Sequence, residues 1–250
     1  MSTTAPYLLL SIRAEPDAAA DEYSSVLRLG ELAPSELHGI NLTQRPLGTI
    51  DLDEWSGIIL GGGPYNVSDT VGDKTTTQRR VESELVDLLG RIVDSDFPFL
   101  GCCYGVGALG SVIGATIDRS HGEPVGATTV SLTAAGHDDP LFAGLPDTFD
   151  AYGGHKEAAS ALPEFAVHLA TSPACPVQAF RVGANVYATQ FHPELDADSL
   201  ATRIDVYRDF GYFDPESAES LKASAREHDA RHPAMILRRF VHRYRRMTSG

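Results

Sequence analysis

Residues 98–105 carry the sequence Pro-Phe-Leu-Gly-Cys-Cys-Tyr-Gly, and this stretch decides the fold. The apolar run at residues 97–100 predicts a short strand that is buried on both faces of a sheet. Residues 106–113 form an apolar segment followed by Gly114, which predicts a short helix that ends there. The stretch is therefore a tight turn between a buried strand and a helix, the repeating unit of α/β folds.

The same alternation precedes this turn along the chain. Apolar runs at residues 7–13 and 57–60 predict two more buried strands. Helical spacing of apolar residues predicts helices over residues 17–32 and 76–93. Strands that alternate with helices pair in parallel and carry helices on both faces. The first half therefore predicts an α/β protein with a flavodoxin-like, doubly wound, mostly parallel sheet.

The second half of the chain has a different pattern. Strand-like segments separated by turn clusters predict a smaller antiparallel set, at residues 115–133, 165–171, 176–181 and 185–190. After Pro193 the pattern becomes helical, at residues 198–210, 215–228 and 233–244. We expect a domain over residues 1–195 and a helical C-terminal extension, packed on it, over residues 196–250.

The composition limits the kind of protein. The chain of 250 residues is 42% hydrophobic, and its formal net charge of -14 argues against general nucleic-acid binding, which needs a basic surface. Its apolar runs are far shorter than the roughly 20 residues of a membrane helix, and no signal peptide is evident. Three cysteines, two of them adjacent, make no disulfide framework. These features predict a cytoplasmic protein with neither nucleic acid nor membrane as partner.

Arginines crowd the C-terminal end of this acidic chain, at Arg226, Arg231, Arg238, Arg239, Arg243, Arg245 and Arg246. A solvated helix face explains such a cluster. A docking surface for an acidic partner or a phosphate-bearing ligand is the more specific alternative. Both interpretations stay open, and the second predicts that removing residues 233–250 weakens association with a partner.

Cys103 has the local setting of a nucleophile. Gly101 and Gly105 lie two residues before and two residues after it, the pattern of a nucleophile elbow with cysteine in place of serine. The glycines let neighbouring backbone pass close to a sharp turn. The side chain then projects at the carboxyl end of the sheet, beside a helix N-terminus that favours the thiolate. Cys102 is expected to point to the opposite side, and Cys175 to lie in the core.

His192 and Glu194 complete the expected set. A cysteine nucleophile needs a base and a group that orients the base. Of nine histidines, His192 directly follows a clean apolar strand, at residues 185–190. Because strand ends gather at one edge of such a sheet, His192 can meet Cys103 although they are far apart in sequence. Glu194 can accept a hydrogen bond from the second imidazole nitrogen and fix the tautomer.

These motifs together resemble the class I glutamine amidotransferases, most of all the amidotransferase domain of GMP synthase in a stand-alone form. The resemblance rests on Gly-Cys-Cys-Tyr-Gly at residues 101–105 and Gln-Phe-His-Pro-Glu at residues 190–194. Gly-Gly-Gly-Pro at residues 61–64 resembles the family's oxyanion loop. Residues 152–157 resemble its Ser-His-x-Asp segment, and residues 174–179 its Cys-Pro-Val-Gln-Ala strand. The matching segments occur in the family's order over roughly residues 8–195.

The resemblance implies a cysteine-dependent amidase that needs no metal or organic cofactor. Cys103 would attack the side-chain amide of glutamine or a related γ-glutamyl compound, and His192, held by Glu194, would move the protons. The backbone N–H groups of Gly63 and Tyr104 would hold the oxyanion. The implied substrate-binding positions are Gly62, Gly107, His155 and Gln190.

The match departs from the family pattern at two positions. Gly107 stands four residues after the nucleophile, where the family usually has glutamine, and Glu157 replaces the aspartate of the Ser-His-x-Asp segment. Since the family's glutamine helps form the glutamine pocket, Gly107 bears on the identity of the amide donor and not on the chemistry. No ATP-pyrophosphatase motif follows Leu195. We therefore expect a free-standing amidase or a subunit that passes ammonia to a separate synthetase partner.

Other interpretations remain open. A non-catalytic or regulatory module that kept the fold is one, and Gly107 favours it. A redox-sensing cysteine on a flavodoxin-like scaffold is another. Residues 61–63 resemble a phosphate cradle only weakly, because Pro64 removes a donor and no Lys-Ser/Thr follows. A zinc site would need Cys102, Cys103, His155 and His192, which lack paired Cys-x-x-Cys spacing.

Overall fold

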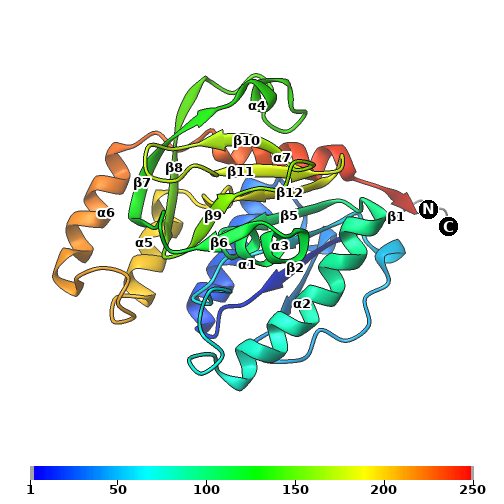
Figure 1. Ribbon diagram of the computed structural model, residues 1–250, viewed down its shortest axis with the longest axis horizontal. Helices are drawn as coiled ribbons and strands as arrows, with labels where there is room; N and C mark the ends of the chain where they lie inside the picture. The colour runs from blue at the N-terminus through cyan, green and yellow to red at the C-terminus, as the bar shows by residue number, and fades with distance from the viewer. Residues whose placement is uncertain (1–2, 249–250) are drawn as a thin grey trace.

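The computed structural model describes residues 3–248 and is built around a twisted sheet of nine strands in the order β3-β2-β4-β5-β12-β11-β10-β7-β8 (Figure 1). One side of the sheet is parallel, formed by β3 (Leu37–Asn41), β2 (Tyr7–Ser11), β4 (Gly57–Leu60), β5 (Phe99–Cys102) and β12 (Val186–Thr189). The other side is antiparallel, formed by β11 (Ala179–Val182), β10 (Val167–Thr171), β7 (Glu123–Leu132) and β8 (Thr148–His155). The predicted fold class is confirmed.

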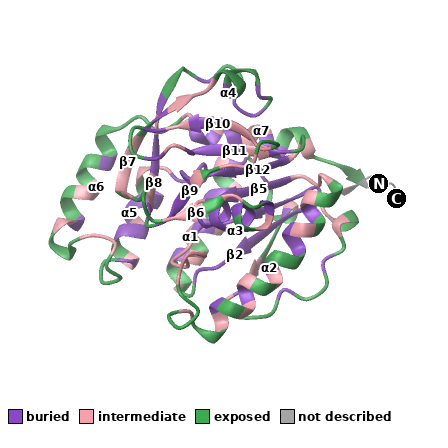
Figure 2. Ribbon diagram, in the orientation of Figure 1, coloured by how far each residue is buried: buried purple, intermediate pink, exposed green. Residues whose placement is uncertain are grey.

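Helices cover both faces of the parallel strands. One face packs on α2 (Thr76–Ser95) and α3 (Tyr104–Ile113), and the other on α1 (Pro16–Leu29) and α7 (Pro233–Tyr244). Helices α5 (Ala197–Val206) and α6 (Ala218–Glu227) lie at the end of the sheet near β7 and β8, where they share a smaller core with Tyr152. The central strands and the inner faces of these helices form the buried interior in Figure 2.

The remaining elements are short. Strand β6 (Thr116–Asp118) pairs antiparallel with β9 (Ala158–Ala161), and β1 (Thr3–Thr4) with β13 (Met247–Thr248). Helix α4 (Ala134–Asp138) follows β7, and single 3₁₀ turns occur at Pro34–Glu36, Leu52–Glu54 and Pro215–Ser217. Within residues 3–248, no helix is both long enough and apolar enough to cross a bilayer.

The structure corrects two expectations about strands and contains strands that the sequence pattern missed. The expected strand at residues 115–133 is two strands, β6 and β7, because residues 119–122 form a turn. Strand β12 pairs parallel with β5, so it extends the parallel sheet instead of belonging to the antiparallel set. The sequence pattern missed β3, an edge strand without an apolar run, and β8, whose Gly153 and Gly154 near its end resemble a turn.

Helix α7 is an integral part of the core. Its residues Ile236, Leu237, Phe240 and Val241 are buried against the sheet, and the Tyr7 hydroxyl donates a hydrogen bond of 2.5 Å to the carbonyl of Val241. Removing residues 233–250 would therefore expose a sheet face, so that deletion cannot report on docking alone. The boundary between residues 195 and 196 stays a prediction.

Several C-terminal arginines have partners within the chain. Arg238 pairs with Glu31 at 3.2 Å, Arg239 donates to the carbonyl of Leu141, and Arg245 pairs with Glu36 at 3.3 Å. Arg246 donates to the carbonyls of Asp53 and Trp55. These contacts hold α7 and the chain after it against the α/β core. The docking interpretation of this cluster stays a prediction.

Truncating Phe240 to alanine is expected to lower the free energy of unfolding by about 3–5 kcal/mol, because a buried aromatic side chain leaves a cavity. The ring is fully buried, 6.1 Å from the Tyr7 ring and 5.0 Å from the Tyr244 ring between centroids. Urea denaturation measures the change. Val86→Ala on α2, where the side chain is 49% exposed, serves as the control and is expected to change stability little. Equal losses in the two variants would contradict the role of α7 in the core.

Candidate active site

Cys103 lies at the turn between β5 and α3 in a strained backbone conformation. Its φ of 53° and ψ of -92° are unusual for a residue with a side chain. A Cβ on Gly101 would lie 2.9 Å from the Cα of Gly105, so the turn can close only with glycine there. The Cys103 N–H donates to the carbonyl of Thr189 at 2.7 Å, which ties the turn to β12. This is the elbow geometry that the sequence predicts.

The two adjacent cysteines have opposite environments. Cys102 is 1% exposed in the core shared with α1 and α7, and burial raises the pKa of its thiol well above the usual value. Cys103 is only partly buried and lines the pockets described below. Of the pair, Cys103 is therefore the accessible sulfur.

His192 reaches Cys103 because β12 and β5 are neighbouring parallel strands. Thr189 at the end of β12 pairs with Cys102 at the end of β5, so the two chain turns leave the sheet at the same edge. The His192 imidazole and the Cys103 side chain line the same pocket, on either side of Gly62. A Cβ on Gly62 would lie 2.5 Å from Cε1 of His192 and 3.2 Å from Cβ of Cys103, so only glycine fits against both.

Glu194 binds the other side of the same imidazole. Its Oε1 is 2.6 Å from Nδ1 of His192, and both side chains are buried. Burial disfavours the imidazolium, but Glu194 and Cys103 outweigh it and raise the pKa of His192 to about 9. Burial likewise opposes ionisation of Glu194, but His192, and then Arg203, lower its pKa to about 2. Near neutral pH the pair is an imidazolium and a carboxylate.

Glu194→Gln is expected to remove a pH-dependent part of the stability. Since the pKa of His192 rises from 6.5 to about 9 on folding, its contribution is complete below about pH 6.5 and lost as the pH rises towards 9. Since the pKa of Glu194 falls from 4.5 to about 2, its contribution is complete above about pH 4.5 and lost as the pH falls towards 2. The difference in unfolding free energy between wild type and variant should therefore be largest between about pH 4.5 and 6.5.

Urea denaturation at a series of pH values measures this difference. The exposed Glu216 offers a matched substitution, Glu216→Gln, for which a flat difference across the same range is expected. A flat difference for Glu194→Gln as well would show that the pair does not carry these charges.

Behind Glu194 lies a buried cluster of charges that the sequence pattern did not reveal. Arg13 donates through Nε to Glu22 at 2.8 Å, and Arg203 lies 4.0 Å from the same carboxylate and donates to Asp21. Arg13, Glu22 and Arg203 are each at most 5% exposed. The only signals in the sequence were an arginine at the end of an apolar run and a glutamate within an amphipathic helix. The cluster places buried charges at fixed positions near the Glu194 carboxylate.

The expected oxyanion donors flank the sulfur. Tyr104 begins α3, so its N–H has no acceptor inside the helix. Gly63 lines both pockets beside Cys103. A Cβ added to Gly63 would lie 2.5 Å from Cγ1 of Ile12, so this position excludes any larger residue. Among the hydrogen bonds of the described residues, none uses either N–H as donor.

Two pockets meet at Cys103, sharing Gly63, Gly154 and Tyr212. We call the first the polar pocket. Its cavity volume is about 20 Å³, and its further lining includes Asn66, Lys156, Glu157 and the predicted residues His155 and Gln190. We call the second the apolar pocket. Its cavity volume is about 70 Å³. It is lined by His192 and mainly by Val125, Leu195, Leu200, Ile204, Tyr207 and Phe213, with Arg13 and Arg203 also at its wall.

The expected substrate-binding residues have different surroundings. Gln190 is 2% exposed, and its Oε1 has no hydrogen-bond partner within the described chain. Both ring nitrogens of His155 are engaged, Nδ1 with the carbonyl of Glu157 at 2.9 Å and Nε2 with Glu123 at 3.0 Å. His155 therefore holds the wall of the polar pocket in place. Gly62 packs on His192 and Cys103, and Gly107 lies behind the pocket wall on α3.

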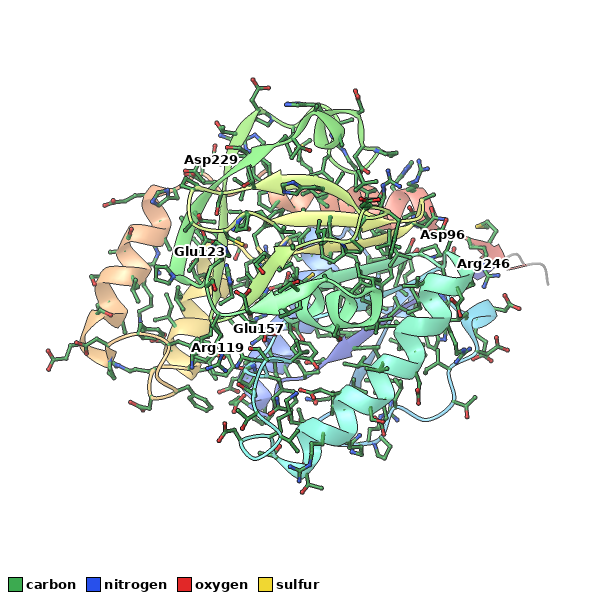
Figure 3. All side chains as sticks on the ribbon, in the orientation of Figure 1. Asp96, Arg119, Glu123, Glu157, Asp229 and Arg246 are labelled. Carbon is green, nitrogen blue, oxygen red and sulfur yellow. The ribbon has the colours of Figure 1, made fainter. Side chains whose placement is uncertain are left out.

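Glu157 and Gly107, the two departures from the family pattern, are in contact. The Glu157 carboxylate accepts hydrogen bonds from the N–H groups of Val67 (3.0 Å) and Ser68 (2.8 Å). Arg119 contacts the same loop at Ser68, and Figure 3 labels both Arg119 and Glu157. A Cβ on Gly107 would lie 2.5 Å from Oε1 of Glu157. The absent side chain at 107 thus makes room for the longer acid at 157.

Glu123, His155 and Cys175 place ligand-type atoms within 4.8 Å of one another. These atoms already have partners. Glu123 accepts hydrogen bonds from Ser172 and Gln178 and binds His155, and the Cys175 thiol donates to the carbonyl of Val177. Burial raises the pKa of Cys175 to about 12, which keeps the thiol protonated. The cluster is a hydrogen-bonded support for β7, β8 and the His155 wall.

The chain belongs to the class I glutamine amidotransferase family, since the family model "Glutamine amidotransferase class-I" matches residues 27–204. It is 28% identical over 162 residues to a glutamine-hydrolysing GMP synthase subunit of Thermoplasma acidophilum, covering 64% of this chain and 72% of that protein. It is 32% identical over 148 residues to a glutamine-hydrolysing GMP synthase of Thermomicrobium roseum, covering 59% of this chain but only 25% of that protein.

Solved structures share the fold over nearly the whole chain. A glutamine amidotransferase of Thermotoga maritima superposes with a TM-score of 0.75 at 22% identity, covering 96% of this chain and 98% of that one. A glutamine amidotransferase of Methylobacillus flagellatus gives a TM-score of 0.74 at 16% identity, covering 99% and 98%. At these identities the likeness concerns the fold alone, and it includes the C-terminal helices.

Proposed function

We propose that this protein hydrolyses the γ-amide of glutamine, or of a related γ-glutamyl compound, through a thioester on Cys103. The observation that carries the proposal is the strained, accessible Cys103, which shares a pocket with the buried imidazole of His192 that Glu194 holds. A strained nucleophile at the end of a parallel strand, next to a proton donor with a fixed tautomer, is the arrangement that acyl transfer requires.

The proposed steps use only groups around the sulfur. The Cys103 thiolate attacks the amide carbon, and the oxyanion accepts hydrogen bonds from the N–H groups of Gly63 and Tyr104, each typically worth about 3 kcal/mol. His192 donates its proton to the departing nitrogen as the C–N bond breaks. It then takes a proton from water, which attacks the thioester and releases glutamate and the Cys103 thiol.

The polar pocket suits the amino acid end of the substrate. Gln190 Oε1, buried and without a partner in the described chain, can accept from the α-ammonium group, and Lys156 can face the α-carboxylate. The free cysteines fit a reduced, cytoplasmic setting. We also propose that released ammonia passes to a separate synthetase partner. This rests on likeness to a protein named as one subunit of GMP synthase.

The test is ammonia release from glutamine and from γ-glutamyl amides, measured for the wild type and for Cys103→Ala. Release that depends on Cys103 is expected. Equal signals from both proteins would end the enzyme hypothesis for those substrates. The outcome would then favour a regulatory module, the alternative that Gly107 supports.

A further inference from the structure

The apolar pocket lies on the side of the sulfur from which the leaving group departs. His192 lines this pocket and is absent from the lining of the polar pocket, whereas Cys103 and Gly63 line both. In amide hydrolysis the imidazolium protonates the departing nitrogen, so that nitrogen must leave towards His192. The polar pocket therefore receives the acyl half of a substrate, and the apolar pocket receives whatever the nitrogen carries.

Ammonia does not explain such a pocket. Besides Arg13 and Arg203, the pocket is lined by side chains with large apolar surfaces, among them Leu195, Leu200, Ile204 and Phe213. It is also larger than the polar pocket, with a cavity volume of about 70 Å³ against about 20 Å³. Ammonia is small and polar and gains nothing from apolar contacts. A ligand pocket with mostly apolar walls favours a ligand with apolar surface to bury.

The C-terminal segment supplies much of the apolar lining of this pocket. Leu200 and Ile204 come from α5, and Tyr212 and Phe213 from the connection between α5 and α6. Tyr212 borders both pockets, and Lys156 lies 4.3 Å over its ring, so the segment is held against the polar pocket's wall. The connection between α5 and α6 therefore forms the pocket wall on the side of Cys103 from which the leaving group departs.

We infer that the substrate class is an N-substituted γ-glutamyl amide whose leaving amine carries an apolar group in the apolar pocket. This inference rests on the proposed function. The γ-carbonyl carbon forms a bond to Sγ of Cys103 and loses its bond to nitrogen, and His192 gives that nitrogen a proton. The free amine departs through the apolar pocket, and water then releases glutamate and the thiol.

The experiment compares γ-glutamyl-phenethylamide with glutamine, measuring released phenethylamine and released ammonia separately. We expect kcat/KM to be at least about tenfold higher for the phenethylamide, the size of effect that apolar contacts in a pocket supply. Cys103-dependent hydrolysis that prefers glutamine overturns the inference and leaves the proposed function standing. Hydrolysis of neither compound overturns both.

A series of variants tests whether the preference for the phenethylamide over glutamine arises in the apolar pocket. Phe213→Ala is expected to lower the ratio of the two kcat/KM values about tenfold by raising KM for the phenethylamide, and Phe213→Leu to restore most of it. Phe165→Ala is the matched control, because Phe165 is 60% exposed and outside both pockets, and its ratio should equal that of the wild type. A ratio unchanged in folded Phe213→Ala, or one lowered equally in Phe165→Ala, overturns the inference.

Discussion

Cys103→Gly is expected to abolish hydrolysis and to stabilise the protein. Loss of the nucleophile removes the thioester route, and catalysis should fall by roughly 10⁴-fold or more. The φ of 53° at Cys103 is a conformation that glycine adopts without strain, and such strain costs about 1–3 kcal/mol. Since glycine also loses more chain entropy on folding, we expect a net gain of about 1 kcal/mol in unfolding free energy. Amide hydrolysis assays and urea denaturation measure the two effects.

Cys103→Ala is the matched control, because it also lacks the thiol but keeps the Cβ that causes the strain. It should lose activity as completely as the glycine variant without the gain in stability. A glycine variant no more stable than the alanine variant would show that the elbow stores no strain. Residual activity within about tenfold of wild type in either variant would remove Cys103 from the mechanism.

Gly107→Gln is expected to destabilise the protein by about 2–3 kcal/mol, because the added Cβ would lie 2.5 Å from Oε1 of Glu157 in a buried site. The Glu157 carboxylate would have to leave the N–H groups of Val67 and Ser68. Glu157→Asp alone should also destabilise, since the shorter side chain withdraws from the same donors. The double variant, which restores the family's glutamine and aspartate, should be more stable than the sum of the two single changes predicts.

Urea denaturation of the four proteins gives the coupling energy, expected at about 1–3 kcal/mol in favour of the double variant. Gly90→Gln is the matched control, since an added Cβ at Gly90 in α2 meets nothing within 4 Å, and it should be neutral or slightly stabilising. Strictly additive losses would show that the two departures from the family pattern are independent. Equal losses of unfolding free energy in Gly107→Gln and Gly90→Gln would show that a helical position disfavours glutamine in place of glycine, and that contact with Glu157 is not the cause.

The sequence determined the parallel half of the fold because apolar periodicity follows burial directly. A run such as residues 57–60 can be buried on both faces only inside a sheet, and α2 shows one apolar side at helical spacing. Strands β3 and β8 were not predicted, because their burial leaves no clear apolar pattern in the sequence. They owe their pairing to neighbours already in place, and their own residues carry weak patterns.

The sequence by itself also determined the residues around the nucleophile, because an elbow needs glycines at fixed offsets from Cys103 and this requirement is local. The tertiary structure alone decided what the site contacts. The charges of Arg13, Glu22 and Arg203 lie behind Glu194, Glu157 fills the space that Gly107 leaves, and Tyr212 and Phe213 wall the leaving-group side. These residues come from distant segments, and their contacts depend on how helices pack on the sheet. Packing of that kind leaves no periodic pattern along the chain.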